Sequence, residues 1–124
     1  IIERIGDHAT RIAWNASNLF DDKVDQRKIE AIVSAYGLAS RIFEKSIDSW
    51  FKKDAEMLNE NIEQVSRLVS QCEAINKMPL RATSRQVQSI SYISESIRRI
   101  GEYSRDILEL VIDYLVGKEE FLGD

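Results

Sequence analysis

Apolar residues recur along four stretches of the chain at alternating steps of three and four positions. The first stretch carries Ile2, Ile5, Ala9, Ile12, Ala16 and Leu19. The second carries Ile29, Ile32, Tyr36, Ala39, Phe43, Ile47 and Trp50, and the third carries Leu58, Ile62, Val65, Val69, Cys72 and Ile75. The fourth carries Ile90, Ile93, Ile97, Ile100, Ser104, Ile107, Val111 and Tyr114. This spacing predicts four amphipathic helices, and no stretch alternates with the period of two that is typical of strands.

Capping and breaking residues set the expected ends of these helices. The first helix should span residues 2 to 20 and the second residues 25 to 52, with Asp54 as the N-cap of the third. Pro79 should stop the third helix, Thr83 or Ser84 should cap the fourth, and Gly117 should end it. Short connections between four helices predict an all-α fold, an antiparallel bundle of four helices.

Size and charge narrow the class of protein. The 124 residues suffice for one hydrophobic core, and a net charge of -4 argues against both nucleic-acid binding by this segment and a polybasic membrane anchor. No apolar run approaches the roughly 20 residues that a membrane-spanning helix needs. The single Cys72 cannot form an internal disulfide, which fits a reducing compartment. We therefore expect a cytoplasmic chain without membrane insertion.

One motif occurs twice, as IERIGDHATRI at residues 2–12 and as IRRIGEYSRDI at residues 97–107. The matched pairs are Ile2 with Ile97, Arg4 with Arg99, Ile5 with Ile100, Gly6 with Gly101, Asp7 with Glu102 and Ile12 with Ile107. Such a match indicates an internal duplication, here of a three-helix unit that carries the motif on its last helix. Residues 1–20 would then be the last helix of a first, truncated repeat, 24–117 a complete second repeat and 118–124 a C-terminal tail.

The string ERIGDHATRIA, from Glu3 to Ala13, is similar to the E-R-x-x-D signature of the PhoU phosphate-uptake regulators. The K-K-D-A-E junction from Lys52 to Glu56 also resembles the PhoU repeat. The resemblance implies two three-helix repeats and a role in reporting phosphate status to a protein partner. That partner would be a phosphate transporter, a sensor kinase or a DNA-binding domain attached to the same chain.

Three carboxylates are candidate metal ligands. Glu3 and Asp7 lie four residues apart and so share a helix face, and helical bundles hold di-iron and di-manganese sites with such carboxylates. The resemblance implies surface metal clusters of iron, zinc or manganese, with Glu3, Asp7 and, in the second copy, Glu102 as ligands. Arg98 stands in the second copy where the first has Glu3. The alternative is that these carboxylates form solvated ion pairs with neighbouring arginines.

The motifs present and absent in the sequence decide which classes of function are considered. No nucleophile with an oriented base, no glycine-rich phosphate loop and no C-x-x-C motif is present, so we expect no enzymatic activity. The first hypothesis is a PhoU-like regulator that acts by protein–protein contact. The alternative is a structural or dimerisation module of a longer protein with no metal or phosphate role, and a carboxylate-bridged metal enzyme comes third. We also expect a homodimer, because a first helix separated from its own repeat would leave Ile2, Ile5, Ile12 and Leu19 only partly covered.

Overall fold

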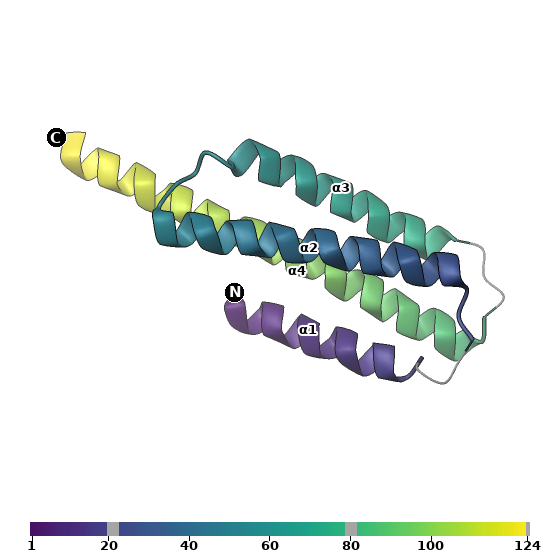
Figure 1. Cartoon of the computed structure of the whole chain (residues 1–124). Helices are drawn as coiled ribbons and strands as arrows, with labels where there is room; N and C mark the ends of the chain where they lie inside the picture. The colour runs from purple at the N-terminus through teal and green to yellow at the C-terminus, as the bar shows by residue number, and fades with distance from the viewer. Residues whose placement is uncertain (20–22, 79–81, 124) are drawn as a thin grey trace.

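The computed structural model describes residues 1–19, 23–78 and 82–123, with the side chains given up to Lys118. Four helices make up nearly all of it: α1 (Ile2–Ser17), α2 (Gln26–Lys52), α3 (Leu58–Lys77) and α4 (Ser84–Gly123). The residues described include no strand. Successive helices run in opposite directions (Figure 1), so the predicted all-α antiparallel bundle is confirmed.

The helix α4 is the centre of this arrangement. It packs against α1, α2 and α3, and α2 also packs against α3. Within the described part of the chain, the backbone of α1 lies close to that of α4 and does not come close to that of α2 or α3. Figure 1 shows α1 along one flank of the molecule, on the side away from α3. The fold is therefore a three-helix bundle, α2 to α4, with α1 added onto its longest helix.

The predicted stripe of α4 is confirmed as the core of the molecule. Its members Ile90, Ile93, Ile97, Ile100, Ser104, Ile107 and Val111 are all buried. Only Tyr114, the last member of the stripe, is half exposed. A helix with neighbours on three sides buries a wide face, so almost every position of its apolar stripe is covered.

In α2 the buried side differs from the predicted stripe. The buried positions are Lys28, Ala35, Leu38, Ala39, Ile42, Ser46 and Ser49, whereas Ile29, Tyr36 and Trp50 are exposed. The small side chains of Ala35, Ala39 and Ser46 allow α2 to approach its neighbours closely, which places the bulkier apolar residues on its flank. The predicted stripe is thus only the edge of the buried surface.

The cap predicted for α4 is confirmed, and α2 has a cap that was not predicted. Asp25 caps α2 by accepting a hydrogen bond from the Arg27 backbone N–H at 2.9 Å. At the start of α4, the Thr83 hydroxyl accepts from the Gln86 N–H at 3.2 Å while the Gln86 side chain accepts from the Thr83 N–H at 3.0 Å, which is a capping box.

Three predicted helix ends are wrong. Asp54 does not cap α3, which begins four residues later; its carboxylate accepts from the Glu56 N–H in a turn instead. Gly117 does not end α4, because it has an ordinary helical φ and the good helix formers Lys118, Glu119 and Glu120 follow it. The residues expected to form a tail therefore continue α4 as far as Gly123. The first helix ends at Ser17 instead of at residue 20. Residue 20 itself and Pro79, the predicted stop of the third helix, lie outside the described residues.

Candidate functional site

Polar and aromatic side chains attach the first motif to α4. Arg4 donates a hydrogen bond to the Tyr103 hydroxyl at 3.3 Å, and its guanidinium lies 5.9 Å from the centre of that ring. One turn later, Nδ1 of His8 lies 3.1 Å from the Ser96 hydroxyl. The His8 ring also lies beside Tyr103, with 5.9 Å between the ring centres. Tyr103 therefore contacts two successive turns of α1.

The same contact line continues along α1. The Arg11 guanidinium lies 4.5 Å from the centre of the Tyr92 ring and 3.8 Å from a carboxylate oxygen of Glu95. Asn15, one turn further, is buried and donates a hydrogen bond to the Arg11 carbonyl at 2.8 Å. The α1–α4 interface therefore combines this row of polar contacts with apolar packing by the buried Ile5 and the partly buried Ile12. Ile5 was expected to be only partly covered, and for this residue the expectation is wrong.

The ionisation of His8 depends on this interface. Burial lowers the pKa of the His8 imidazole, and the positive charges of Arg11 and Arg99 lower that pKa further. The carboxylates of Glu95 and Asp7 oppose the change and raise the pKa. Because the ordinary value is about 6.5, the ring is neutral at pH 7 and can either donate a hydrogen bond to Ser96 or accept one from it.

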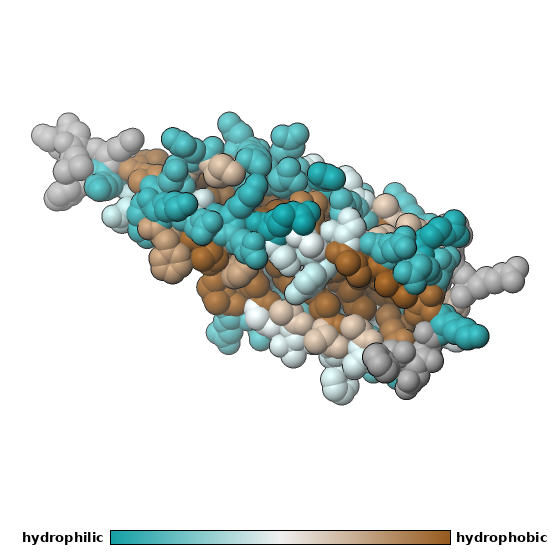
Figure 2. Space-filling model, viewed as in Figure 1, coloured by the Kyte–Doolittle hydropathy of each residue, from teal (hydrophilic) through white to brown (hydrophobic). Residues whose placement is uncertain are grey.

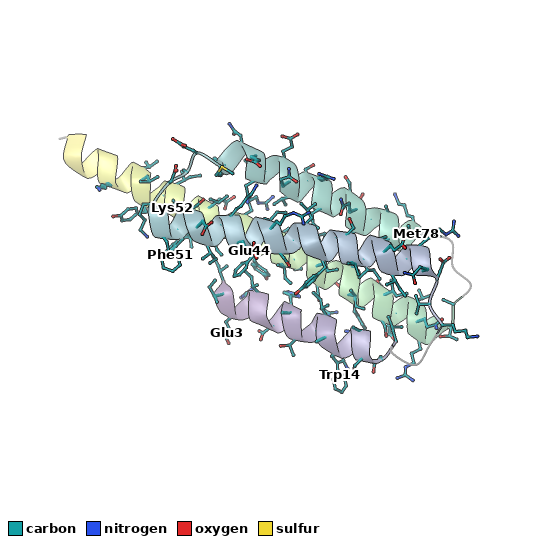
Figure 3. The ribbon with its side chains drawn as sticks, viewed as in Figure 1. Glu3, Trp14, Glu44, Phe51, Lys52 and Met78 are labelled. Carbon is teal, nitrogen blue, oxygen red and sulfur yellow. The ribbon has the colours of Figure 1, made fainter. Side chains whose placement is uncertain are left out.

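Glu3 and Asp7 lie on the outer face of α1, away from this ladder. Both are exposed, and Trp14 shares their face because it follows Asp7 by two helical turns. Figure 3 shows Glu3 and Trp14 pointing away from the bundle on the same side. Arg11, which could have paired with Asp7, reaches Glu95 of α4 instead. The solvated ion pairs considered from the sequence are therefore not the contacts that Arg4 and Arg11 make.

Glu102 lies in a different environment. Its carboxylate is 3.4 Å from Nε of Arg98. Arg98 occupies the position of the second motif that matches Glu3 in the first. Among the residues described, no three His, Cys, Asp or Glu side chains form a group that could hold a metal ion. The structure does not bring Glu102 together with Glu3 and Asp7, and metal binding by these residues stays a prediction.

The glycines of the two motifs also differ in their surroundings. A methyl group on Gly101 would meet Cδ2 of Leu68, a fully buried residue of α3, so α3 and α4 pack closely at this glycine. A methyl group on Gly6 would meet no atom within 4 Å. The second motif thus receives a leucine side chain at its glycine, and the first motif exposes the equivalent position.

The sequence analysis missed Tyr92, Ser96 and Tyr103, although a signal for them exists. Together with Arg99 they recur in α4 at steps of four, three and four positions. Arg4, His8 and Arg11 recur at steps of four and three in α1. Two polar stripes of matching period indicate a helix contact as two apolar stripes do, but an apolar search passes over them.

None of the described helices is both long enough and apolar enough to cross a membrane.

Comparison with known proteins gives one match. Residues 32–111 match the family model for the PhoU domain. This segment covers most of α2, all of α3 and α4 as far as Val111, and it includes the second motif but not the first. No curated protein and no solved structure matches the chain. The division of the chain into a truncated and a complete repeat is not tested by this match and stays a prediction.

Proposed function

Because the chain belongs to the PhoU domain family of phosphate-uptake regulators, we propose that it regulates phosphate uptake or phosphate signalling by contact with a protein partner. The family match carries the proposal. The partner class is a phosphate transporter, a sensor kinase or a DNA-binding domain in the same polypeptide. The net charge of -4 supports a protein partner rather than nucleic acid for this segment.

The outer face of α1, formed by Glu3, Asp7 and Trp14, is the surface that we assign to this partner. Trp14 is 70% exposed, and tryptophan is enriched among the residues that dominate protein–protein binding energy. The two carboxylates beside it supply the charge that orients a basic partner surface. None of the three residues is used in the described contacts between α1 and α4.

A metal ion held by Glu3 and Asp7 would be a second component of this face, beside the protein contact. Glu3 and Asp7 are two carboxylates of the type that binds iron, manganese or zinc, but no third ligand accompanies them in the described part of the chain. The residues present do not complete a metal site, so the proposed contact does not depend on one. Elemental analysis of the purified chain and of Glu3→Ala/Asp7→Ala tests this component. Stoichiometric metal in the wild type that the double variant loses would assign the carboxylates as ligands.

The second candidate is a structural module without a phosphate role. The Arg98–Glu102 pair favours it, because the carboxylate of the second motif forms an ion pair with an arginine of its own helix. A metal-free wild type together with unchanged phosphate uptake in cells that lack the protein would support this candidate.

Phosphate uptake in the source cells tests the proposed function. Deleting the gene should release uptake from repression at high external phosphate, and restoring the wild-type gene should restore repression. Trp14→Ala should restore it only partly, whereas Val87→Ala, a change at an exposed apolar residue of α4, should restore it fully. Unchanged uptake after deletion would contradict the regulatory role. Full restoration by Trp14→Ala would contradict only the assigned face.

A further inference from the structure

Lys28, in the first turn of α2, is buried although it carries a charge. It is 6% exposed, and among the residues whose burial the structure describes it is the only charged one that is buried. Lysine is almost never buried to this extent unless its charge is paired. Within the described part of the chain, its ammonium group forms neither a hydrogen bond nor an ion pair, and the neighbouring Asp25 pairs with Arg27 instead, at 3.4 Å. The described contacts therefore leave the charge of Lys28 without a partner.

A small cavity lies beside this lysine. It has a volume of about 120 Å³ and is lined by Asp25, Arg27 and Lys28 at the start of α2 and by Met78 at the end of α3. Figure 1 shows these two helix ends at the same end of the bundle, and Figure 2 shows hydrophilic residues gathered over the start of α2, next to exposed hydrophobic surface. Pockets for drug-sized ligands have volumes of about 300 Å³ or more, so this cavity has room only for a small ion or a few water molecules.

The charges around the cavity favour an anion. Burial lowers the pKa of the Lys28 ammonium, and the carboxylate of Asp25 raises it. Because burial has the larger effect, the positive charge is less well stabilised here than in water, and a bound anion would compensate it. Arg27 brings a second cation to the lining, and the start of a helix carries a partial positive charge of its own.

Asp25 narrows the choice of anion. Its carboxylate accepts a hydrogen bond from the Arg27 backbone N–H at 2.9 Å, and the hydrogen bonds from Arg27 lower the pKa of Asp25, so the group is ionised at neutral pH. An ionised carboxylate only accepts hydrogen bonds and has lone pairs left for a second donor. It therefore repels sulfate, which carries no proton, but it can accept a hydrogen bond from phosphate, which keeps at least one proton at neutral pH.

We propose that Asp25, Arg27 and Lys28 form a binding site for inorganic phosphate where α2 begins. Lys28 supplies the buried positive charge, Arg27 supplies further N–H donors, and Asp25 accepts a hydrogen bond from the protonated oxygen of the ion. The site shares no residue with the outer face of α1. The proposal does not depend on the proposed regulatory function, because phosphate binding by the purified chain and phosphate uptake by cells are measured separately.

Isothermal titration calorimetry with inorganic phosphate and with sulfate tests the site. The wild type should bind phosphate at millimolar concentration or below, and sulfate about tenfold or more weakly. Lys28→Met should weaken phosphate binding by about tenfold or more, because methionine replaces the buried stem of the lysine but carries no charge. Asp25→Asn should remove the preference for phosphate over sulfate, because asparagine is as good a helix cap as aspartate but does not repel sulfate.

Lys52→Met is the matched control, because it removes the same charge from an exposed lysine at the other end of α2, far from Met78 (Figure 3). It should leave phosphate binding unchanged, and circular dichroism checks that each variant stays helical. A wild type that binds no phosphate at concentrations up to about 10 mM would overturn the proposal and leave Lys28 as a cation that serves only the carbonyl end of α3. Binding that Lys28→Met leaves intact, or a preference for phosphate that survives Asp25→Asn, would overturn it as well.

Discussion

The two copies of the repeated motif, residues 2–12 in α1 and residues 97–107 in α4, have similar sequences and different surroundings. The α4 copy lies among three helices, and its first isoleucine, Ile97, has no exposed surface. Among the described helices, only α4 comes close to the backbone of the α1 copy, and the matching Ile2 is 56% exposed. The neighbours that the chain supplies, rather than the motif itself, therefore decide how much of the motif is buried.

The charges of the two copies differ in the same way. In α4 the carboxylate of Glu102 pairs with Arg98 of its own helix. In α1 the arginines of the motif turn to Tyr103 and Glu95 of α4, and the carboxylates of Glu3 and Asp7 are left on the outer face. The enclosed copy thus pairs its carboxylate with an arginine of its own helix, whereas the open copy leaves both carboxylates exposed to solvent.

Truncating the matched isoleucines should produce the largest difference between the copies. Ile97→Ala creates a cavity in the core and should lower the free energy of unfolding by about 2–5 kcal/mol. Ile2→Ala should cost less than about 1 kcal/mol, because its side chain is already partly solvated. Urea unfolding measures both values, and equal losses would show that the two copies are equally buried.

Adding a methyl group to the matched glycines should give effects of opposite sign. Alanine is favoured over glycine by about 1 kcal/mol inside a helix, and Gly6→Ala should realise part of this gain because nothing lies near its new methyl group. Gly101→Ala should destabilise by about 1–2 kcal/mol, because overpacking against the fully buried Leu68 exceeds that gain. The same unfolding assay measures the pair. A gain in stability from Gly101→Ala would contradict the close packing of α3 on α4.

These differences also show how far the sequence determines the fold. Periodicity predicted four helices and the buried stripe of α4, because a helix enclosed on three sides buries whichever apolar stripe it has. It misplaced the buried side of α2, since an apolar pattern does not tell which neighbour covers which flank. The small residues Ala35 and Ala39 were the better guide, because they permit close helix approach.

The candidate site was predictable to a smaller extent. The spacing of Glu3 and Asp7 placed both on one face, as observed. The ion pair between Glu102 and Arg98 could have been predicted from the sequence, because the two residues are four positions apart on one helix. The contacts of Arg4, His8 and Arg11 with α4 were indicated only by two polar stripes of matching period, because they join positions more than 80 residues apart and depend on how two helices pack.

Protonation of His8 should give the smallest effect. Its pKa is lowered in the folded chain, so the unfolded chain takes up the proton first as the pH falls through about 6.5. The free energy of unfolding should therefore fall as the pH is lowered from about 6.5 to the pKa of His8 in the folded chain. His8→Gln should remove this part of the pH dependence. Because the chain has a single histidine, its ring proton signals in NMR titrate without overlap. A ring pKa at or above about 6.5 would contradict the burial of His8 against α4.

Amide hydrogen exchange tests most directly the claim that the two copies of the motif are held differently. At low protein concentration, where copies of the chain are apart, α1 can open by giving up its contacts with α4 alone, while the α4 motif opens only with the whole bundle. Amides of residues 6–12 should therefore exchange at least tenfold faster than those of residues 101–107. Equal protection of the two segments would show that α1 is as firmly held as α4 and would contradict the account.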